Sequence, residues 1–504
     1  MWAVKSVILF HADQMRFDAL GCSPNRFART PNIDRLAASG AVFTRHIASN
    51  PVCMPSRASL MTGLYVGGHG VWMNGVPLNR REYVQYNGAY EHWGIRVVPE
   101  PPTLADVFAH CGYDTVGLGK FHLTPTLSPA GHGFPESEAL WDEGRWADWH
   151  GPYYGFRHVE MTLGHGEGPC RRGHYARWLA TEHPEIHGQV AREQSQHHCP
   201  VPSLPELYAS AVPGELHNSA WLARRACAYL AEGRPKDKPF FMFVGFPDPH
   251  HPFTPSCDVV REFEGLAVQE PRDPRGDGVR GSPGLQLNPC SVAGLSAEER
   301  RTILRYTHAM VYQIDRAVGA VLDELRRQGL ENDTIVVFTS DHGDFLCDHG
   351  LLRKGYMGSD ALLRVPFVVR APGAGLPARS DVPMSNADVL PTLCGLAGVA
   401  APEHVQGRDV REVLGPGASQ RVFASAFCGR PGMANFTCYD ERFRYTGWPG
   451  AGYEELFDHA HDPGESRNVA GERAWSSVVS EMRAAIGEHL VRTTHPIVGA
   501  VSAW

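Results

Sequence analysis

Short runs of apolar residues recur along this chain, and polar residues suited to chemistry follow the clearest of them. These runs cover residues 7–10, 240–244 and 335–338. They are short and rich in β-branched and aromatic residues, which is typical of strands that are buried on both faces. Asp13 follows the first run and Asp341 follows the last. Because ligands of such sheets gather at the carboxyl ends of the strands, we expect these loops to share one site.

A helical pattern at residues 296–329 separates the last two runs. Ser296 and Glu299 form a capping box at its start. Apolar residues then recur at helical spacing, namely Ile303, Met310, Ile314, Val318 and Leu325. Gly329 ends the pattern. The alternation of strands and helices predicts an α/β sandwich, in which helices cover a large, mixed but mostly parallel sheet.

The periodicity weakens in the middle of the chain. Residues 125–235 are rich in Trp, His, Gly and Pro, and residues 255–295 are irregular. We interpret the region 125–295 as containing insertions over the active site, where the substrate is selected.

The pattern changes again beyond residue 400. Three segments alternate like antiparallel strands and a helical segment follows them: residues 421–427, 435–439, 443–448 and 472–491. We therefore expect an α/β catalytic domain at residues 1–400 and a small C-terminal α+β subdomain at residues 401–504.

Composition narrows the classes of function. The chain has 504 residues, 43% apolar and 20% charged, with a net charge of -8. This mild acidity argues against non-specific binding to nucleic acid or to an anionic membrane. With neither a membrane-spanning stretch nor a signal-like start, we expect a cytoplasmic protein. The twelve cysteines are scattered without a CxxC pair, which favours reduced thiols over a disulfide framework.

The most specific motif is Cys53-Met54-Pro55-Ser56-Arg57, which fits the pattern C-x-P-x-R. A buried cysteine in front of a helix is the alternative interpretation for an isolated match. Together with the stretch at residues 58–63, however, the motif resembles the signature of type I sulfatases, which belong to the alkaline phosphatase superfamily. The resemblance implies an alkaline-phosphatase-like fold. It also implies a separate maturation enzyme that reads C-x-P-x-R and oxidises Cys53 to formylglycine.

The modification has a chemical reason. A formylglycine hydrate carries two hydroxyl groups on one carbon. One oxygen attacks sulfur and expels the alcohol, and deprotonation of the other hydroxyl then expels sulfate and restores the aldehyde. A serine has no second hydroxyl with which to release sulfate in this way.

Two further blocks predict a metal site. Asp13-Gln14 follows the first strand and Asp341-His342 follows a later one. The resemblance implies that these residues bind one divalent ion together with residue 53. Oxygen-rich ligands favour calcium, and the single imidazole makes manganese the alternative. Many family members have Asp-Asp and Asp-Asn instead, whereas Asp-Gln and Asp-His are typical of choline-sulfatase-like and phosphonate-monoester-hydrolase-like relatives, so Gln14 is a weaker candidate ligand than Asp13.

Cationic residues match the remaining family blocks. Gly119-Lys120-Phe121-His122 matches G-K-x-H, Pro249-His250-His251-Pro252-Phe253 matches P-H-x-P-F, and Lys354 lies downstream of the second metal block. The resemblance assigns Lys120 and His122 to the formylglycine oxygens, and His250 and Lys354 to the sulfate and the leaving alcohol. It places Arg57 between the nucleophile and the metal loop. Together they supply the positive charge that a transferring sulfuryl group needs.

Weaker candidates remain open. Asn74 is a candidate substrate contact or an ordinary turn residue. A zinc site is conceivable at Cys170, His174, His197, His198 and Cys199, but their spacing fits no familiar zinc pattern. Tryptophans at residues 141, 146 and 149 either stack on a substrate or pack internally. We interpret the family-like block at residues 455–468 as structural docking.

These observations favour a sulfuric ester hydrolase that acts on a small anionic sulfate ester. The alternative within the superfamily is a phosphonate monoester or phosphodiester hydrolase with the same formylglycine. A catalytically dead binding protein is disfavoured because every reactive residue is retained. The leaving alcohol and a possible homo-oligomeric state stay open.

Overall fold

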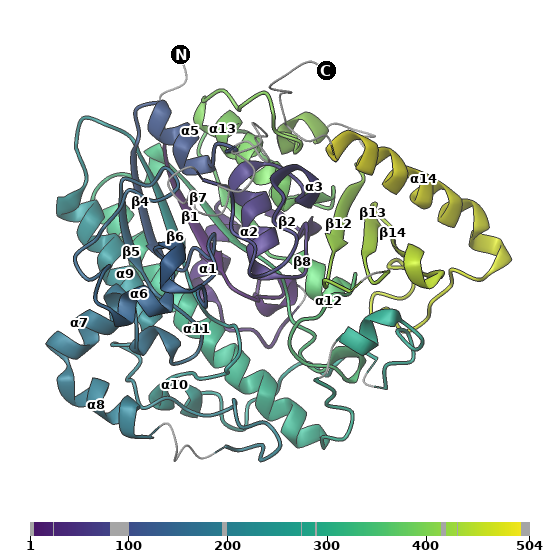
Figure 1. The fold of residues 1–504 in the computed structure, drawn as a ribbon, viewed down its shortest axis with the longest axis horizontal. Coiled ribbons are helices and arrows are strands. Elements are labelled where there is room, and N and C mark those ends of the chain that lie inside the picture. Colours follow the sequence, from purple (N-terminus) through teal and green to yellow (C-terminus); the bar gives the residue numbers. More distant parts are fainter. Residues whose placement is uncertain are drawn as a thin grey trace.

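The computed structural model describes residues 5–23, 25–80, 100–193, 199–273, 275–287, 290–414, 420–430 and 432–494. In Figure 1 the central sheet and its helices form the larger part of the molecule, and a smaller sheet with one long helix lies beside it. None of the helices described is both long and apolar enough to cross a bilayer. All twelve cysteines are free thiols, as the sequence predicted.

An eight-stranded sheet forms the centre, in the order β10-β2-β9-β7-β1-β6-β4-β5. Its parallel strands are β1 (Ser6–Ala12), β4 (Asp114–Gly119), β5 (His158–Met161), β6 (Phe240–Gly245) and β7 (Thr334–Ser340). The strands beyond β7 are β9 (Phe367–Arg370), antiparallel to both neighbours, β2 (Ala41–Phe43) and β10 (Arg379–Ser380). The predicted mixed, mostly parallel sheet is confirmed.

Both faces of the sheet are covered by helices. Val7 and Leu9 of β1 point into one core and Ile8 and Phe10 into the other. The first core is covered by α2 (Cys53–Thr62), α5 (Leu104–His110) and α13 (Val389–Ala397). The second is covered by α1 (Pro31–Ala38), α7 (His174–Glu182), α9 (Asn218–Ala228) and α11 (Ala297–Arg327). Each such side chain that is fully buried contributes about 1.5–3 kcal/mol to folding.

The predicted central helix is α11. Its capping box is present, because the Ser296 hydroxyl accepts from Glu299 N and the Glu299 carboxylate accepts from Ser296 N. The helix ends at Arg327, and Gly329 has a φ of 69° beyond it.

The middle region does more than cover the site, so our interpretation of it as insertions was incomplete. It contains α6 (Glu138–Asp142), α7, α8 (Pro184–Glu193) and α10 (Cys257–Arg261). It also supplies β5, the edge strand of the sheet, and α9, which packs beside α11. The sequence signal of β5 is weak because the strand has only four residues and alternates polar His158 and Glu160 with apolar Val159 and Met161, so it forms no apolar run.

The C-terminal sheet has the order β12-β13-β14-β15. Its strands are β12 (Val422–Ala426), β13 (Asn435–Tyr439), β14 (Phe443–Trp448) and β15 (Tyr453–Asp458), and α14 (Ser476–Thr493) packs on them. The first three strands and the helix were predicted. β15 was missed, because residues 455–458 were interpreted only as a docking block.

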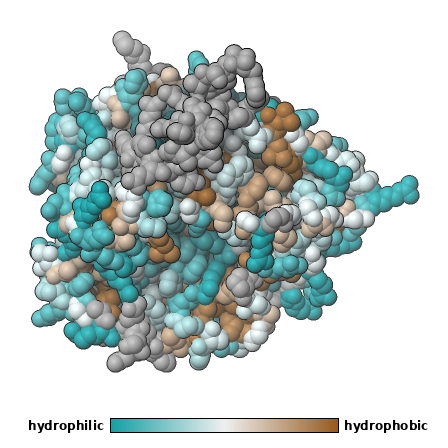
Figure 2. Space-filling model, in the orientation of Figure 1, coloured by the Kyte–Doolittle hydropathy of each residue, from teal (hydrophilic) through white to brown (hydrophobic). Residues whose placement is uncertain are grey.

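A small three-stranded sheet links the two parts. It consists of β3 (His46–Ile47), β8 (Arg364–Val365) and β11 (Met384–Ser385). The short helix α12 (Asp360–Leu363) contacts β8, and the short helix α3 (Val66–His69) contacts α2 and α14. Figure 2 shows hydrophobic side chains at the end of α14 nearest α3, where an apolar cavity of about 280 Å³ lies between α3, β12 and α14.

Candidate active site

The predicted residues converge at the carboxyl ends of the central strands. Asp13 follows β1 and Asp341 follows β7, and the parallel pairing of these strands brings Ala12 beside Ser340. Cys53 reaches the same place from the first residue of α2. Asp13, Asp341 and Cys53 are all fully buried, so their charges must be balanced within the site.

Cys53 lies among cations and carboxylates. Its Sγ is 2.6 Å from Lys354 Nζ, 3.2 Å from His342 Nε2 and 3.7 Å from Asp13 Oδ1. Burial alone would raise the pKa of the thiol, but the ammonium groups of Lys354 and Lys120 outweigh it and hold the pKa well below its usual value. The surroundings of residue 53 therefore stabilise negative charge.

Arg57 joins the loops around the nucleophile. It lies one helical turn after Cys53, and its Nε donates to Asp341 Oδ2 at 2.8 Å. Its Nη2 is 3.3 Å from Asp13 Oδ2, and its Nη1 donates to the carbonyl of Lys120 at 2.9 Å. The guanidinium thus lies between both carboxylate loops and the loop after β4.

The predicted metal ligands are close enough to share one ion. Candidate ligand atoms of Asp13, Cys53, Asp341 and His342 all lie within 4.8 Å of one another. Two carboxylates and one imidazole, all buried, make a donor set that suits a hard or borderline divalent cation. These residues therefore fit the ion that the resemblance implies.

Gln14 adjoins this set of candidate ligands. Its backbone N donates to Asp341 Oδ1 at 2.9 Å, and its Nε2 donates to Asp344 Oδ2 at 2.5 Å. The same Nε2 is 3.1 Å from His251 Nδ1. Gln14 Oε1 is buried and has no hydrogen-bond partner within the described part of the chain. An orphaned buried oxygen is costly unless it binds something, so Gln14 is a better ligand candidate than the sequence indicated.

The predicted cationic residues surround Cys53. Lys354 Nζ bonds to His250 Nε2 at 2.8 Å, and Lys120 Nζ bonds to Asp13 Oδ2. Burial and the neighbouring ammonium of Lys120 lower the pKa of His122. His122 Nδ1 is buried and unpaired among the residues described. The structure thus brings together every residue to which the sequence assigned catalysis.

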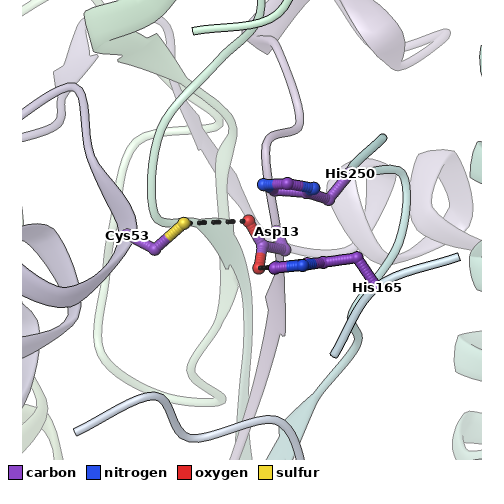
Figure 3. Close-up of side chains that lie close together, drawn as sticks. All are labelled: Asp13, Cys53, His165 and His250. Atoms are coloured by element: carbon purple, nitrogen blue, oxygen red, sulfur yellow. Dashed lines mark hydrogen bonds and ion pairs between the residues drawn. The ribbon is translucent and has the colours of Figure 1, made fainter. Parts of the chain in front are cut away.

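The sequence analysis did not single out four residues that contact the site: Glu136, His165, His251 and Asp344. Figure 3 shows His165 beside His250 and next to Asp13. The rings of His165 and His250 stack with their centroids 3.6 Å apart. The only local signal for His165 is its position between two glycines. His251 comes directly after the candidate His250, and Asp344 comes two residues after the candidate His342.

Other candidates have structural contacts. Asn74 Oδ1 accepts from Met54 N at 3.0 Å, so this side chain caps the start of α2 beside the nucleophile. His174 Nδ1 accepts from Met161 N and its Nε2 bonds to the carbonyl of Trp149. Within the described residues, Cys170 and His174 belong to no group suited to a metal; His197 and His198 lie outside those residues.

The tryptophans of the middle region pack internally. Trp141 is 8% exposed and its Nε1 donates to the carbonyl of Pro135. Trp146 and Trp149 pack on the first core with their ring centroids 5.2 Å apart. These contacts are internal packing.

An α/β sandwich with a buried nucleophile, carboxylates and cations at the ends of its parallel strands defines a hydrolase of the alkaline phosphatase superfamily. The sulfatase family model matches residues 5–399, and this chain belongs to the sulfatase family. The C-terminal model of N-sulphoglucosamine sulphohydrolase matches residues 347–492.

Individual relatives support the same class. The multifunctional alkaline phosphatase superfamily protein PehA of Trinickia caryophylli is 28% identical, over 95% of this chain and 93% of its own. An arylsulfatase of Clostridium perfringens is 26% identical, over 95% of this chain and 92% of its own. The solved phosphonate monoester hydrolase of Agrobacterium radiobacter is 25% identical with a TM-score of 0.75, covering 97% of this chain and 96% of its own.

Proposed function

We propose that this protein hydrolyses sulfate monoesters with a formylglycine made from Cys53. The observation that carries the proposal is the position of Cys53 at the start of α2, between Lys354, His342 and Asp13. A nucleophile there lies between cations that can hold sulfuryl oxygens and carboxylates that can hold a metal ion. The C-x-P-x-R sequence at residues 53–57 supports recognition by a formylglycine-generating maturation enzyme.

The surrounding residues have different roles in the proposed reaction. A formylglycine hydrate supplies two hydroxyl groups on one carbon, which permits sulfuryl transfer to one oxygen and later release of sulfate. Lys120 holds the formylglycine oxygens, and His250 and Lys354 bind the sulfuryl oxygens as charge develops on them. His122 accepts the proton of the second hydroxyl, and the Lys354–His250 pair donates a proton to the leaving alcohol.

A divalent ion completes the proposal. Asp13, Gln14, Asp341 and His342 hold it, with calcium expected first and manganese as the alternative. When bound, the ion supplies Lewis-acid stabilisation of the attacking oxygen. Chelation should abolish turnover, and Asp341→Ala should prevent recovery at ordinary metal concentrations.

A second candidate function is hydrolysis of phosphonate monoesters or phosphodiesters. The Asp13-Gln14 and Asp341-His342 pairs and the similarity to the Agrobacterium hydrolase favour it. Both reactions take place at a tetrahedral anionic centre, and the same cations stabilise the charge that develops on its oxygens. The two functions therefore share their nucleophile and differ in the preferred substrate.

One experiment tests both candidates. Protein matured with a competent enzyme should carry an aldehyde at residue 53, measured by mass spectrometry, and should hydrolyse sulfated sugars, aryl sulfates or alkyl sulfates. Cys53→Ala should lose nearly all turnover while folding normally. Cys394→Ala, at a buried free thiol of α13, is the matched control and should keep its aldehyde and activity.

Two results would contradict the proposal. Full activity with an unmodified thiol at Cys53 would refute the formylglycine mechanism. A kcat/KM for the best phosphonate more than about tenfold above that for every sulfate, roughly 1.4 kcal/mol of transition-state preference, would establish the second candidate instead.

A further inference from the structure

A loop after β5 brings one more histidine into the site. Gly164 and Gly166 flank His165, and both have positive φ angles, 78° and 56°. A Cβ at Gly166 would lie 3.0 Å from the ring of Pro252, so glycine lets this loop pack against the segment that carries His250. The His165 side chain is 25% exposed, so it stands at the solvent side of an otherwise buried cluster.

The first contact of His165 is with Lys120. Its Nε2 is hydrogen-bonded to Lys120 Nζ, which is also bonded to Asp13 Oδ2. His165 Nε2 lies 3.6 Å from the same carboxylate oxygen. An ammonium group only donates hydrogen bonds, so His165 Nε2 is the acceptor. Two of the three N–H groups of Lys120 are therefore held, and within the described residues the third is left for the nucleophile or a substrate oxygen.

The second contact of His165 is with His250. Their rings stack with centroids 3.6 Å apart and an interplanar angle of 15°, as Figure 3 shows. The other side of this pair is fixed by Lys354, whose Nζ is 2.8 Å from His250 Nε2. Together with the His251 ring, which also stacks on His250 with centroids 4.1 Å apart, this stacking fixes the plane of the His250 ring and keeps its Nε2 in line with Lys354.

We infer that His165 is a positioning residue that orients both Lys120 and His250 toward the transferring group. The inference rests on the proposed function and adds a residue to its site. His165 anchors the Lys120 ammonium through its Nε2 and the His250 imidazole through its ring face. A misplacement of about 1 Å in such groups can reduce turnover about 100-fold, so the anchor should affect kcat more than KM.

The same side chains do not form a second metal site. Candidate ligand atoms of four residues lie within 4.8 Å of one another: Asp13, Cys53, His165 and His250. However, Lys120 contacts Asp13 and His165. Lys354 contacts Cys53 and His250. Asp13 and Cys53 also belong to the set that we propose to hold the ion, so a separate ion here would have only His165 and His250 as ligands of its own.

Two substitutions separate the two contacts. His165→Phe keeps a ring to stack on His250 and removes the acceptor for Lys120. His165→Gln keeps an acceptor at the same reach and removes the ring. Each should lower kcat about 10-fold or more at a nearly unchanged KM. His158→Phe, at an exposed ring stacked on His150 in the same region, is the matched control and should keep wild-type turnover.

A double-mutant cycle with Lys120→Met provides the decisive measurement. If His165 acts through Lys120, His165→Phe should have little further effect once Lys120 is replaced. The combined effect of the two substitutions should then differ from the product of their separate effects by about 10-fold. The cycle is measured on kcat and, independently, on the binding of inorganic sulfate by calorimetry. Thermal unfolding and the aldehyde content of each variant show whether the fold and the maturation are preserved.

Each outcome has one meaning. Additive effects in both cycles would overturn the inference, because His165 would then act independently of Lys120. Loss of one equivalent of metal in His165→Phe would also overturn it and make His165 a ligand. A wild-type protein that hydrolyses neither sulfates nor phosphonates would refute the proposed function, whereas coupled sulfate binding would still support His165 as the anchor of Lys120.

Discussion

Lys354 and His250 are paired at the side of the site where the leaving alcohol is expected. Burial, together with His165 and Lys354, lowers the pKa of His250 well below its usual value. Burial would lower the pKa of Lys354 as well, but the negative charges of Cys53 and Asp13 outweigh it and raise that pKa. With Cys53 as the thiol, the proton of the pair therefore resides on Lys354, and His250 accepts its hydrogen bond.

This assignment predicts a dependence on the leaving group. Lys354→Met should damage hydrolysis of an alkyl or sugar sulfate far more than hydrolysis of nitrophenyl sulfate, because nitrophenolate leaves without a proton. General acid catalysis is worth about 10²–10⁴-fold. His250→Ala should change the ratio of kcat/KM values for the two substrates by less than Lys354→Met does. The ratio of kcat/KM values for the two substrates is the measurement. Equal damage on both would mean that the pair only binds sulfate.

Asp248 predicts a pH dependence of stability. Burial raises its pKa to about 7; one carboxylate oxygen accepts from the Ser219 hydroxyl and the other has no partner in the described residues. The folded state therefore binds a proton that the unfolded state releases near pH 4, so this group makes stability fall as pH rises from about 4 to about 7.

Asp248→Asn should remove that dependence. The variant should be more stable than wild type at pH 8, by at most about 4 kcal/mol for a shift of about three pKa units, and the advantage should vanish near pH 4. Denaturant unfolding at several pH values measures it. An advantage that is the same at pH 5 and pH 8 would exclude titration of Asp248 as its cause.

At the scale of elements, the turn after β4 depends on one buried carboxylate. Glu136 accepts from the backbone N of His122 at 2.5 Å, and from those of Leu123 and Thr124 at 2.9 Å each. His122 has a φ of 55°, a left-handed conformation that a non-glycine residue adopts at a cost. Glu136 offsets this cost and so sets the direction of the proposed base.

Glu136→Gln should therefore affect both stability and turnover. An amide has one acceptor oxygen where the carboxylate has two, so at least one buried N–H loses its partner, at a cost of about 1–3 kcal/mol. We expect kcat to fall about 10-fold or more. Glu138→Gln, two residues away in a partly exposed pair with Arg172, is the control and should change stability by less than about 1 kcal/mol. Equal effects of both variants would contradict this role.

At the scale of the whole molecule, Glu465 joins the C-terminal subdomain to the segment that follows Lys354. It pairs with the buried Arg444 of β14. Its Oε2 accepts from Asp360 N at 3.0 Å and from the Ser359 hydroxyl at 3.1 Å, at the start of α12. The block at residues 455–468, which we interpreted from sequence as structural docking, therefore contacts the start of α12 directly through Glu465.

Removing the Glu465 carboxylate should lower the free energy of unfolding, because it removes contacts both to β14 and to the start of α12. Glu465→Ala leaves the Arg444 charge buried without its closest partner, which typically costs about 3–5 kcal/mol. Glu472→Ala, in an exposed pair with Arg467, should cost less than about 1 kcal/mol. Denaturant unfolding measures both. A Glu465→Ala protein as stable as the Glu472→Ala protein would show that the subdomain is held by its apolar contacts alone.

Contiguous sequence determined the strands and the residues that follow them. β1, β6 and β7 were predictable because an uninterrupted apolar run is a local signal of burial on both faces. Cys53 and Asp341 were predictable because each belongs to a short motif whose neighbours are adjacent in the chain. The capped helix α11 was predictable for the same reason, since capping and helical periodicity act over a few residues.

Only the tertiary structure decided which distant side chains support these groups. His165 lies 45 positions after Lys120, and Asp344 lies 330 positions after the Gln14 amide that it binds. Glu136 holds a turn from a different element, and Asn74 caps the nucleophile helix from a loop. Such contacts depend on how the strands pair and how the loops pack, and no local periodicity encodes them. The candidate reactive groups were therefore determined by the sequence alone, and their orientation was decided by the fold.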